Sequence, residues 1–439
     1  MDAVAKEITH RRVLSVAIPI VISNATYPIL GLVDTGVVGQ LGEAAPIGAV
    51  GIGAIILSGF YWMFGFLRMG TSGLVAQARG AGDAPETGAI LMRGIIIGIT
   101  AGLLLFLLQV PLFWGVFKIA PATGEVEGLA NSYLSIRIWG APASIALYAI
   151  TGWLIAMERT RAVLMLQLWI NGLNIALDLW FVLGLDMGVE GVAIATIIAE
   201  WSGLIFGLWL CVAAFGGDQW RDWSQIFDRI KVHRMMVVSG DIMLRSMMLK
   251  ASFMTFLFIG AGMGNITLAA NQILMQFVEI TAYALDGFAF AAEALVGSAL
   301  GAKNRAALRR AAIMSSQWAF VGAIFLTLVF AIFGPTIIHI MATAPDVRAE
   351  AKTYLWWMVI FPIIGMPSWM FDGIFIGATH TRDMRVAMLQ STVVYVAVLF
   401  LLVPIMGNHG LWLSLMIFDI VRALTLWRYY PKLEASADP

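Results

Sequence analysis

Twelve apolar stretches, each about twenty residues or longer, follow one another along the 439-residue chain. A helix needs about twenty apolar residues to cross the hydrocarbon core of a bilayer, and its backbone must satisfy its hydrogen bonds within the helix. The mean hydropathy of +0.86 and the charged fraction of 12% exclude an ordinary soluble domain. We therefore expect an all-α polytopic membrane protein with twelve transmembrane helices, at residues 13–38, 47–69, 88–110, 129–156, 162–184, 190–215, 235–260, 267–299, 310–333, 350–377, 385–406 and 410–428.

Lysine and arginine are distributed unequally between the two sides of the predicted membrane. Of the 27, three lie in loops on one side, four lie within helices or at their ends, and twenty lie in the amino-terminal segment, the loops after even-numbered helices and the carboxyl end. Because cytoplasmic loops carry the excess of positive charge, we predict a multi-pass protein of the cytoplasmic (inner) membrane with both termini cytoplasmic. The formal net charge of zero gives no reason to expect a nucleic-acid partner.

Two halves of the sequence resemble each other at a constant offset of 221 residues. VAQARGAGDAPETGAI resembles VGSALGAKNRAALRRA and aligns Gly80 with Gly301, and GAPASIALYAITGWLIAMERTR resembles FPIIGMPSWMFDGIFIGATHTR and aligns Gly152 with Gly373. Six helices per half let both halves enter the membrane from the same side, as in parallel-repeat transporters. We predict an amino-terminal six-helix lobe at residues 1–218, a cytoplasmic inter-lobe linker at 219–234 and a carboxyl-terminal six-helix lobe at 235–439.

A single carboxylate, Asp34, interrupts the first apolar stretch within the segment YPILGLVDTGVVGQLG. An aspartate near the centre of a membrane helix costs about 2.5 to 3.5 kcal/mol on insertion scales, so it is a functional candidate. The repeat aligns it with Thr255, so only the first half carries this charge. Pro19 on the same predicted helix removes a backbone hydrogen bond and lets the helix bend. The alternative is that Asp34 only hydrogen-bonds a neighbouring helix.

A second acid, Asp178, lies on the fifth predicted helix within NGLNIALDLWFVLGL. Asn171 and Asn174 precede it on the same helix face, and Thr196 on the next helix adds a hydroxyl. Two carboxylates, an amide and a hydroxyl make a candidate cation-coupling site, formed by Asp34, Asn174, Asp178 and Thr196. These oxygens suit a sodium ion as a metal ligand set, and a pair of nearby carboxylates can instead hold a proton. The sequence leaves H+ and Na+ open as the coupling ion and indicates no other cofactor.

The second half offers a candidate second polar site. GDIMLRSMMLKAS places Asp241 four residues before Arg245, a spacing suited to an intrahelical ion pair. TAYALDGFAFAAEALVG places Asp286 and Glu293 seven residues apart on one helix face, and Asp372 follows in MFDGIFIGAT. The five residues can line a cation or substrate surface. Pairing with arginine, which would make them structural, is an equal alternative.

The sequence contains no set of catalytic residues. The five histidines are scattered, the single Cys211 cannot form an intrachain disulfide, and no CxxC or HExxH spacing occurs. We therefore expect a non-enzymatic protein that works as a monomer in contact with membrane lipid and a small organic substrate. Methionine and phenylalanine side chains can furnish an adaptable apolar cavity, for which the candidate residues are Tyr27, Asn171 and Met275.

Six segments of the chain resemble the multidrug and toxic compound extrusion (MATE) family, in its DinF-type branch. They are YPILGLVDTGVVGQLG, FLRMGTSGLVAQARGAG, GLNIALDLWFVLGL, GDIMLRS, TAYALDGFAFAAEALVG and DGIFIGAT, and the match extends over nearly the whole chain. The resemblance implies a V-shaped pair of six-helix lobes, alternating access, and export of organic, often cationic, compounds driven by inward flow of protons or sodium ions. It also implies that Asp34 is the central coupling acid, surrounded by Asn174, Asp178 and Thr196, and that bending at Pro19 accompanies its protonation.

Two other kinds of transport are alternatives. Plant relatives similar to this branch include citrate exporters, which leaves the charge of the substrate open. Similar lobes in related families act as flippases for lipids or lipid-linked precursors, but such a protein would need a strongly cationic cavity. The intramembrane basic residues are only Arg68, Arg137, Arg245 and Lys250. The leading hypothesis is a secondary antiporter that exports organic, cationic or amphipathic compounds in exchange for protons or sodium ions.

Overall fold

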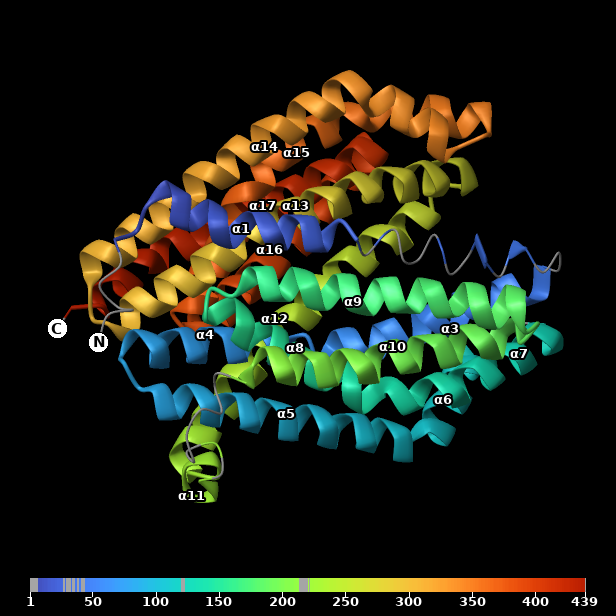
Figure 1. The fold of residues 1–439 in the computed structure, drawn as a ribbon. Helices are drawn as coiled ribbons and strands as arrows, with labels where there is room; N and C mark the ends of the chain where they lie inside the picture. The colour runs from blue at the N-terminus through green and yellow to red at the C-terminus, as the bar shows by residue number, and fades with distance from the viewer. Residues whose placement is uncertain are drawn as a thin grey trace. The chain divides into compact units, whose positions relative to one another are not determined.

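Most of the residues that the structure describes are helical. The computed structural model describes residues 7–26, 28, 33, 36–37, 39–40, 44–119, 123–212, 220 and 222–438. These residues form helices joined by short turns, and no β-strand occurs among them (Figure 1). The predicted all-α class is confirmed.

Eleven helical segments within the described residues are long and apolar enough to cross a membrane. Each corresponds to one predicted span, from the second to the twelfth. The observed helices are longer than several predicted spans because helices such as α13 (Asn265–Gly301) and α14 (Arg305–Met341) continue into polar residues at their ends. The first predicted span, at residues 13–38, falls partly outside the described residues, and its described helix is α1 (His10–Asn24).

Two compact units divide the chain between them. Unit 1 comprises Met1–Val21, Ala76–Gly82 and Val237–Pro439, and unit 2 comprises Ile22–Val75 and Asp83–Met236. These units differ from the predicted lobes in the placement of residues 1–21 and 76–82, and unit 2 also takes in the predicted linker and residues 235–236. The division into two six-helix lobes joined by a linker remains a prediction.

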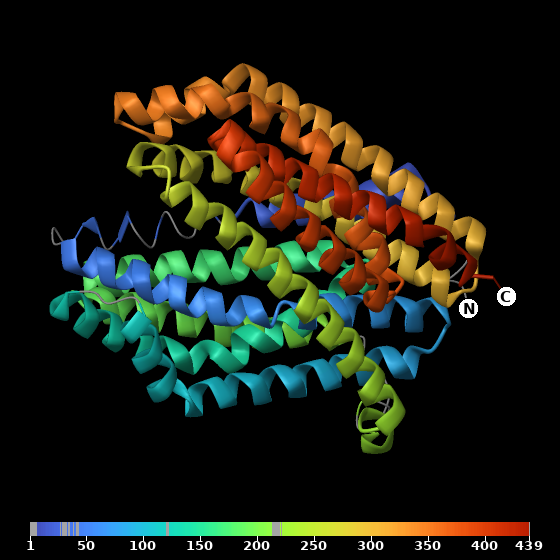
Figure 2. The same ribbon diagram turned by 180° about the vertical axis from the view of Figure 1, so that it is seen from behind.

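The helices of unit 2 are shorter than those of unit 1 from α12 onward. They are α3 (Ala44–Met63), most of α4 (Phe66–Gly80), α5 (Ala84–Leu107), α6 (Gln109–Ile119), α7 (Gly124–Arg137), the 3₁₀ turn η1 (Ile138–Gly140), α8 (Ala141–Ala156), α9 (Thr160–Asp178), the π-helical turn η2 (Leu179–Gly184), α10 (Gly188–Leu210) and α11 (Trp223–Ile226). Unit 1 holds most of α1, most of α12 (Arg229–Ala261), α13, α14, α15 (Pro345–Gly377), α16 (Thr381–Met406) and α17 (Asn408–Ala435). Within unit 1, α16 and α17 run side by side, as the views from front and back agree (Figures 1 and 2).

Small residues let the helices of unit 2 approach closely. Gly94, Gly98 and Gly102 recur every four residues along α5 and all face α8. A methyl group added to Gly98 would overlap the backbone of Ala146. Helices in lipid gain contact area when such small residues bring their backbones together, so this stripe determines how closely α5 and α8 pack.

The internal repeat reappears as a repeated helix contact. In unit 2, Gly152 of α8 lies against the backbone of Arg68 on α4. In unit 1, Gly373 of α15 lies against the backbone of Ala289 on α13. Arg68 and Ala289 are 221 residues apart, the same offset that separates the two glycines. The duplication in the sequence therefore corresponds to equivalent packing in the two units.

The described part of the predicted linker is held against α5. Arg93 Nε donates to the Ile226 carbonyl at 2.7 Å, and its Nη2 atom donates to the Gln225 carbonyl at 2.7 Å. Glu86 pairs with Arg93 at 2.7 Å and with Lys231 at 2.6 Å. The linker is therefore fixed to unit 2 by hydrogen bonds and ion pairs.

The start of α12 is capped by Asp228, just outside the apolar segment. Its carboxylate accepts the backbone N–H groups of Lys231 at 3.0 Å and Ile230 at 2.9 Å. These bonds hold the pKa of the Asp228 carboxyl below its ordinary value, and the bond from Lys231 has the larger effect. The cap satisfies two of the donors that a helix leaves free at its amino terminus.

Candidate functional site

Two residues of the predicted cation site meet where α9 packs on α10. Asn174 Nδ2 donates to Thr196 Oγ1 at 3.1 Å, and the Thr196 hydroxyl donates to the Val192 carbonyl at 2.9 Å. Asn174 is fully buried, and its Oδ1 atom has no hydrogen-bond partner among the described residues. A buried amide oxygen without a donor costs free energy unless a cation or a proton donor reaches it. Because Asn174 bonds Thr196 through Nδ2, no described residue donates to its Oδ1 atom, which lies between α9 and α10.

Asp178 lies one helical turn after Asn174, on the same buried face of α9. Its side chain has an exposed fraction of 0%. It is the last residue of α9 before the π-helical turn η2 begins at Leu179. π-Helical turns are rare and are found frequently at functional sites, and this one forms the last turn of the helix, which ends at Gly184. The structure thus places an acid, an amide and a hydroxyl on adjoining faces of α9 and α10.

The polar face of α9 also contacts the chain just after α1. Asn171 Nδ2 donates to Thr26 Oγ1 at 2.9 Å, while Gln167 Nε2 donates to Asn171 Oδ1 at 2.9 Å. Asn171, which we predicted as a cavity residue, therefore links α9 to the segment after α1 by a hydrogen bond. The predicted coupling acid Asp34 and the predicted cavity residue Tyr27 lie outside the described residues.

Pro19 lies inside α1 and is buried. The boundary between the two compact units crosses α1 between Val21 and Ile22, two residues after this proline. A proline inside a helix removes one backbone hydrogen bond and weakens the helix locally. The position is suited to the bend that was predicted from the sequence.

A second buried polar cluster lies in unit 1, at the contact of α12, α15 and α17. Asp372 pairs with Arg422 at 2.6 Å and with Arg245. Arg422 also pairs with Asp419 at 2.7 Å, and Ser368 donates to Asp419 at 3.1 Å. The two arginines and two aspartates balance one another, and all four are buried. This arrangement favours the structural alternative for Arg245 and Asp372 over a free cation site.

The predicted ion pair between Asp241 and Arg245 is wrong. Asp241 instead pairs with Arg385 at 2.6 Å and accepts a hydrogen bond from Thr381 at 3.0 Å. Both partners come from α16, and Arg245 forms its ion pair with Asp372 of α15. The i, i+4 spacing permitted the pair, but two donors from a neighbouring helix satisfy the carboxylate of Asp241 instead. Asp241 therefore does not belong to the cluster around Asp372.

The other residues of the predicted second site are dispersed along α13. Asp286 is close enough to Arg245 to interact with it electrostatically. Glu293 is fully buried farther along the helix. Met275, a predicted cavity residue, is partly buried against the hydrophobic core of unit 1.

A buried ion pair in unit 2 was not predicted from the sequence. Arg137 Nη1 and Nη2 bond the two carboxylate oxygens of Glu200 at 2.9 and 3.0 Å. The residues are 63 positions apart on different helices, so helical periodicity could not reveal their contact. The sequence offered only a single arginine in the fourth predicted span and an acid near the middle of the sixth, with another span between them.

Comparisons with known proteins agree with this architecture. The MatE family model matches residues 19–180 and 242–401. DNA damage-inducible protein F of Escherichia coli (strain K12) is 36% identical over 421 residues, covering 94% of this chain and 90% of that protein. A Synechocystis sp. protein named "Probable multidrug resistance protein NorM" is 26% identical over 317 residues, covering 70% of this chain and 67% of that protein.

Solved structures share the fold. One described as "Outward-facing conformation of a multidrug resistance MATE family transporter of the MOP superfamily" has a TM-score of 0.87 at 19% sequence identity, covering 97% of this chain and 96% of that chain. The family match, which covers more than half of the chain, and the relative from Escherichia coli identify the family. The chain belongs to the MatE family of membrane transporters, in the DinF-type branch of the multidrug and toxic compound extrusion proteins.

Proposed function

We propose that the protein is a secondary antiporter of the inner membrane, with both termini in the cytoplasm, that exports organic compounds in exchange for protons or sodium ions by alternating access. The observation that carries the proposal is the contact between Asn174 and Thr196, one helical turn from Asp178. Polar side chains buried in an apolar helix pair are expensive to insert and are kept where they bind or relay ions. Asp34 is proposed to complete this site.

The geometry of α9 and α10 supports two ways of taking up a cation. A proton can neutralise one of the two proposed acids and remove the cost of a buried charge. A sodium ion can use the carboxylates together with the Oδ1 atom of Asn174, which has no hydrogen-bond partner among the described residues and is an oxygen ligand of the kind that alkali cations prefer. Either event changes the charge of the α9 face, and we propose that α1 responds by bending at Pro19.

The proposed substrate is an organic compound that is cationic or amphipathic. Relatives named as multidrug resistance proteins support this choice. The cluster in unit 1 supports it as well, because Arg245 and Arg422 are already paired with aspartates and leave no excess positive charge there for an organic anion.

Dye transport under separate ion gradients tests the proposal. Purified protein in liposomes loaded with ethidium is exposed to a proton gradient alone or to a sodium gradient alone. We expect one gradient to drive the dye in the wild type and Asp34→Asn to abolish that transport. Thr196→Val removes the site hydroxyl that accepts a hydrogen bond from Asn174, and losing such a neutral hydrogen bond costs about 1 kcal/mol, so the apparent affinity for the driving ion should fall about fivefold.

Thr255→Val is the matched control. Its hydroxyl bonds the Ala251 carbonyl at 2.8 Å, the same i−4 bond that Thr196 makes, and Thr255 is half-buried like Thr196 but lies in unit 1. It should transport dye as the wild type does. Transport by Asp34→Asn at the wild-type rate would contradict the proposal.

A further inference from the structure

A groove of about 620 Å³ opens on unit 1 between α14, α15 and α17. Its α14 wall follows one helix face from Arg309 through Ile313 to Phe320, and the facing wall includes Trp427 and Tyr430 of α17. A second hollow of about 570 Å³ adjoins it at the charged end of α14 and is lined by Arg305, Arg309, Arg310 and Glu434. One end of the groove is therefore basic and the other apolar.

The three arginines at the basic end differ in how they are paired. Arg305 pairs with Glu434 and with Asp438, both at 3.2 Å. Arg310 pairs with Glu7 at 2.8 Å. Arg309, which lies between them and lines both hollows, makes no hydrogen bond or ion pair with any residue that the structure describes.

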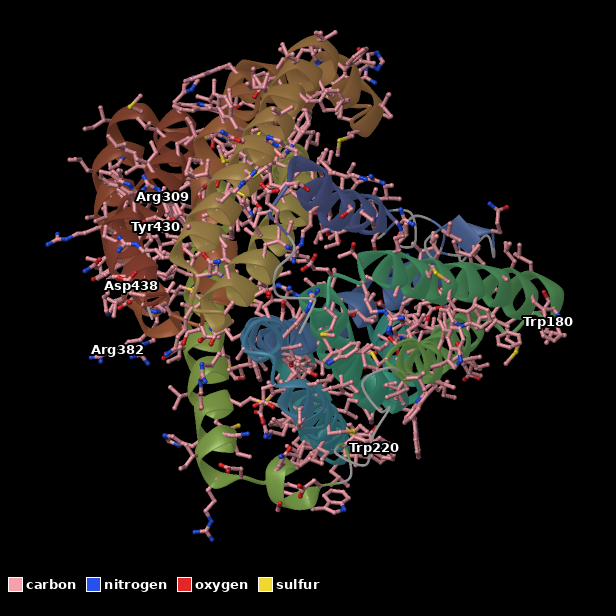
Figure 3. The ribbon with its side chains drawn as sticks, turned by 60° about the vertical axis from the view of Figure 1, so that its left-hand side comes forward. Trp180, Trp220, Arg309, Arg382, Tyr430 and Asp438 are labelled. Atoms are coloured by element: carbon pink, nitrogen blue, oxygen red, sulfur yellow. The ribbon has the colours of Figure 1, made fainter. Side chains whose placement is uncertain are left out.

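The surroundings of Arg309 contain a second polar group. Tyr430 lines the same groove as Arg309, and the two are labelled close together in Figure 3. Tyr430 also packs edge to face on Phe371 of α15, with ring centroids 6.2 Å apart. Among the described residues, none takes the N–H donors of the Arg309 guanidinium, which therefore remain available to a ligand at the mouth of this aromatic groove.

The groove changes from polar to apolar along its length. Phe320 lies eleven residues beyond Arg309, which corresponds to about 16 Å along the axis of α14. Trp427 is 64% exposed, and tryptophan and tyrosine are typical of the boundary between headgroups and hydrocarbon. A soluble anion would use only the basic end, whereas a ligand with a charged head and an apolar chain would fill the whole groove.

We propose that this groove binds one anionic phospholipid. Its phosphate contacts Arg309, and one acyl chain lies along Ile313 and Phe320 between α14 and α17. Basic pockets between membrane helices recognise anionic lipid headgroups in this way, by charge and hydrogen bonding. The site is separate from the polar residues of α9 and α10, since every lining residue belongs to unit 1.

Native mass spectrometry of the full-length protein tests the proposal. The detergent-solubilised protein is mixed with phosphatidylglycerol or with phosphatidylcholine of the same acyl chains, and the retained lipid is counted. The wild type should retain one phosphatidylglycerol in preference to phosphatidylcholine. Arg309→Ala should lower the retained phosphatidylglycerol about fivefold, the effect of one basic residue at a lipid surface. Arg309→Lys should keep most of the binding.

Arg382→Ala is the matched control, because Arg382 is an exposed arginine of unit 1 that does not line the groove (Figure 3). It should bind lipid as the wild type does. The water-soluble headgroup glycerophosphoglycerol should not displace the lipid. Equal retention of both lipids, equal retention by Arg309→Ala, equal loss in Arg382→Ala, or displacement by the free headgroup would each overturn the proposal.

Discussion

Asp178 and Asp372 are both buried acids, but their surroundings differ. Asp178 follows Asn174 by one turn of α9, and no described residue donates a hydrogen bond to the amide oxygen of Asn174. Asp372 lies between Arg245 and Arg422 and accepts hydrogen bonds from both. A carboxylate held between two guanidinium groups has little freedom to bind and release a cation. We therefore expect substitutions at Asp178 to impair transport and substitutions at Asp372 to impair folding.

Asp372→Ala should destabilise the protein strongly. The change leaves Arg245 without its aspartate and Arg422 with Asp419 alone, and breaking a buried ion pair costs about 3 to 5 kcal/mol. Thermal unfolding in detergent can be followed with a fluorogenic thiol reagent at Cys211, the only cysteine. The Cys211 side chain is fully buried, so the folded protein should react slowly and unfolding should expose the thiol.

Asp438→Ala is the control for that measurement. Asp438 pairs with Arg305, but both side chains are half exposed, so its loss should leave the unfolding temperature nearly unchanged. If Asp372→Ala unfolded at the same temperature as Asp438→Ala and lost transport instead, the cluster would be a working ion site rather than a structural one.

Among the elements, the stripe of glycines on α5 is the most sensitive to an added methyl group. Gly98→Ala should destabilise unit 2 by about 1 to 3 kcal/mol, because the new Cβ atom overlaps the backbone of Ala146 and the helices must separate. Gly51→Ala on α3 is the matched control. Nothing lies within 4 Å of its added Cβ atom, and alanine favours a helix, so this change should not destabilise the protein. The Cys211 unfolding assay should show a loss for Gly98→Ala only. Equal unfolding temperatures for the two variants would rule out close packing of α5 on α8.

The helices could be predicted from the sequence because each span depends on a local property, the hydropathy of about twenty neighbouring residues. Contacts between distant residues could not be predicted in the same way. Arg245 and Asp372 are 127 positions apart, and the spacing that was available, between Asp241 and Arg245, indicated the wrong partner. The contact of Asn174 with Thr196 was predictable because consecutive helices with short connections pack together. Neither Asp34 nor Tyr27 lies in the described part, so their places in the site remain predictions.

At the scale of the whole molecule, the two halves share their helix packing but differ in the polar side chains that they bury. The offset of 221 residues aligns Asn174 with Tyr395 and Asp178 with Leu399. Both second-half residues belong to the hydrophobic core of unit 1. The repeated glycine contacts show that the packing is shared, whereas the polar face of α9 occurs in one half only. A feature present in only one copy is more directly related to function than one required by the shared fold.

Coupling between the two fluxes is the central claim, and the reverse reaction measures it most directly. Proteoliposomes with a dye gradient and no initial ion gradient are monitored for ion movement, with a pH-sensitive dye for protons and a sodium-sensitive dye for sodium. Antiport predicts that dye flow in one direction drives one of these ions in the other, and that Asp34→Asn abolishes the ion flux. Dye flow that moves neither ion would contradict antiport.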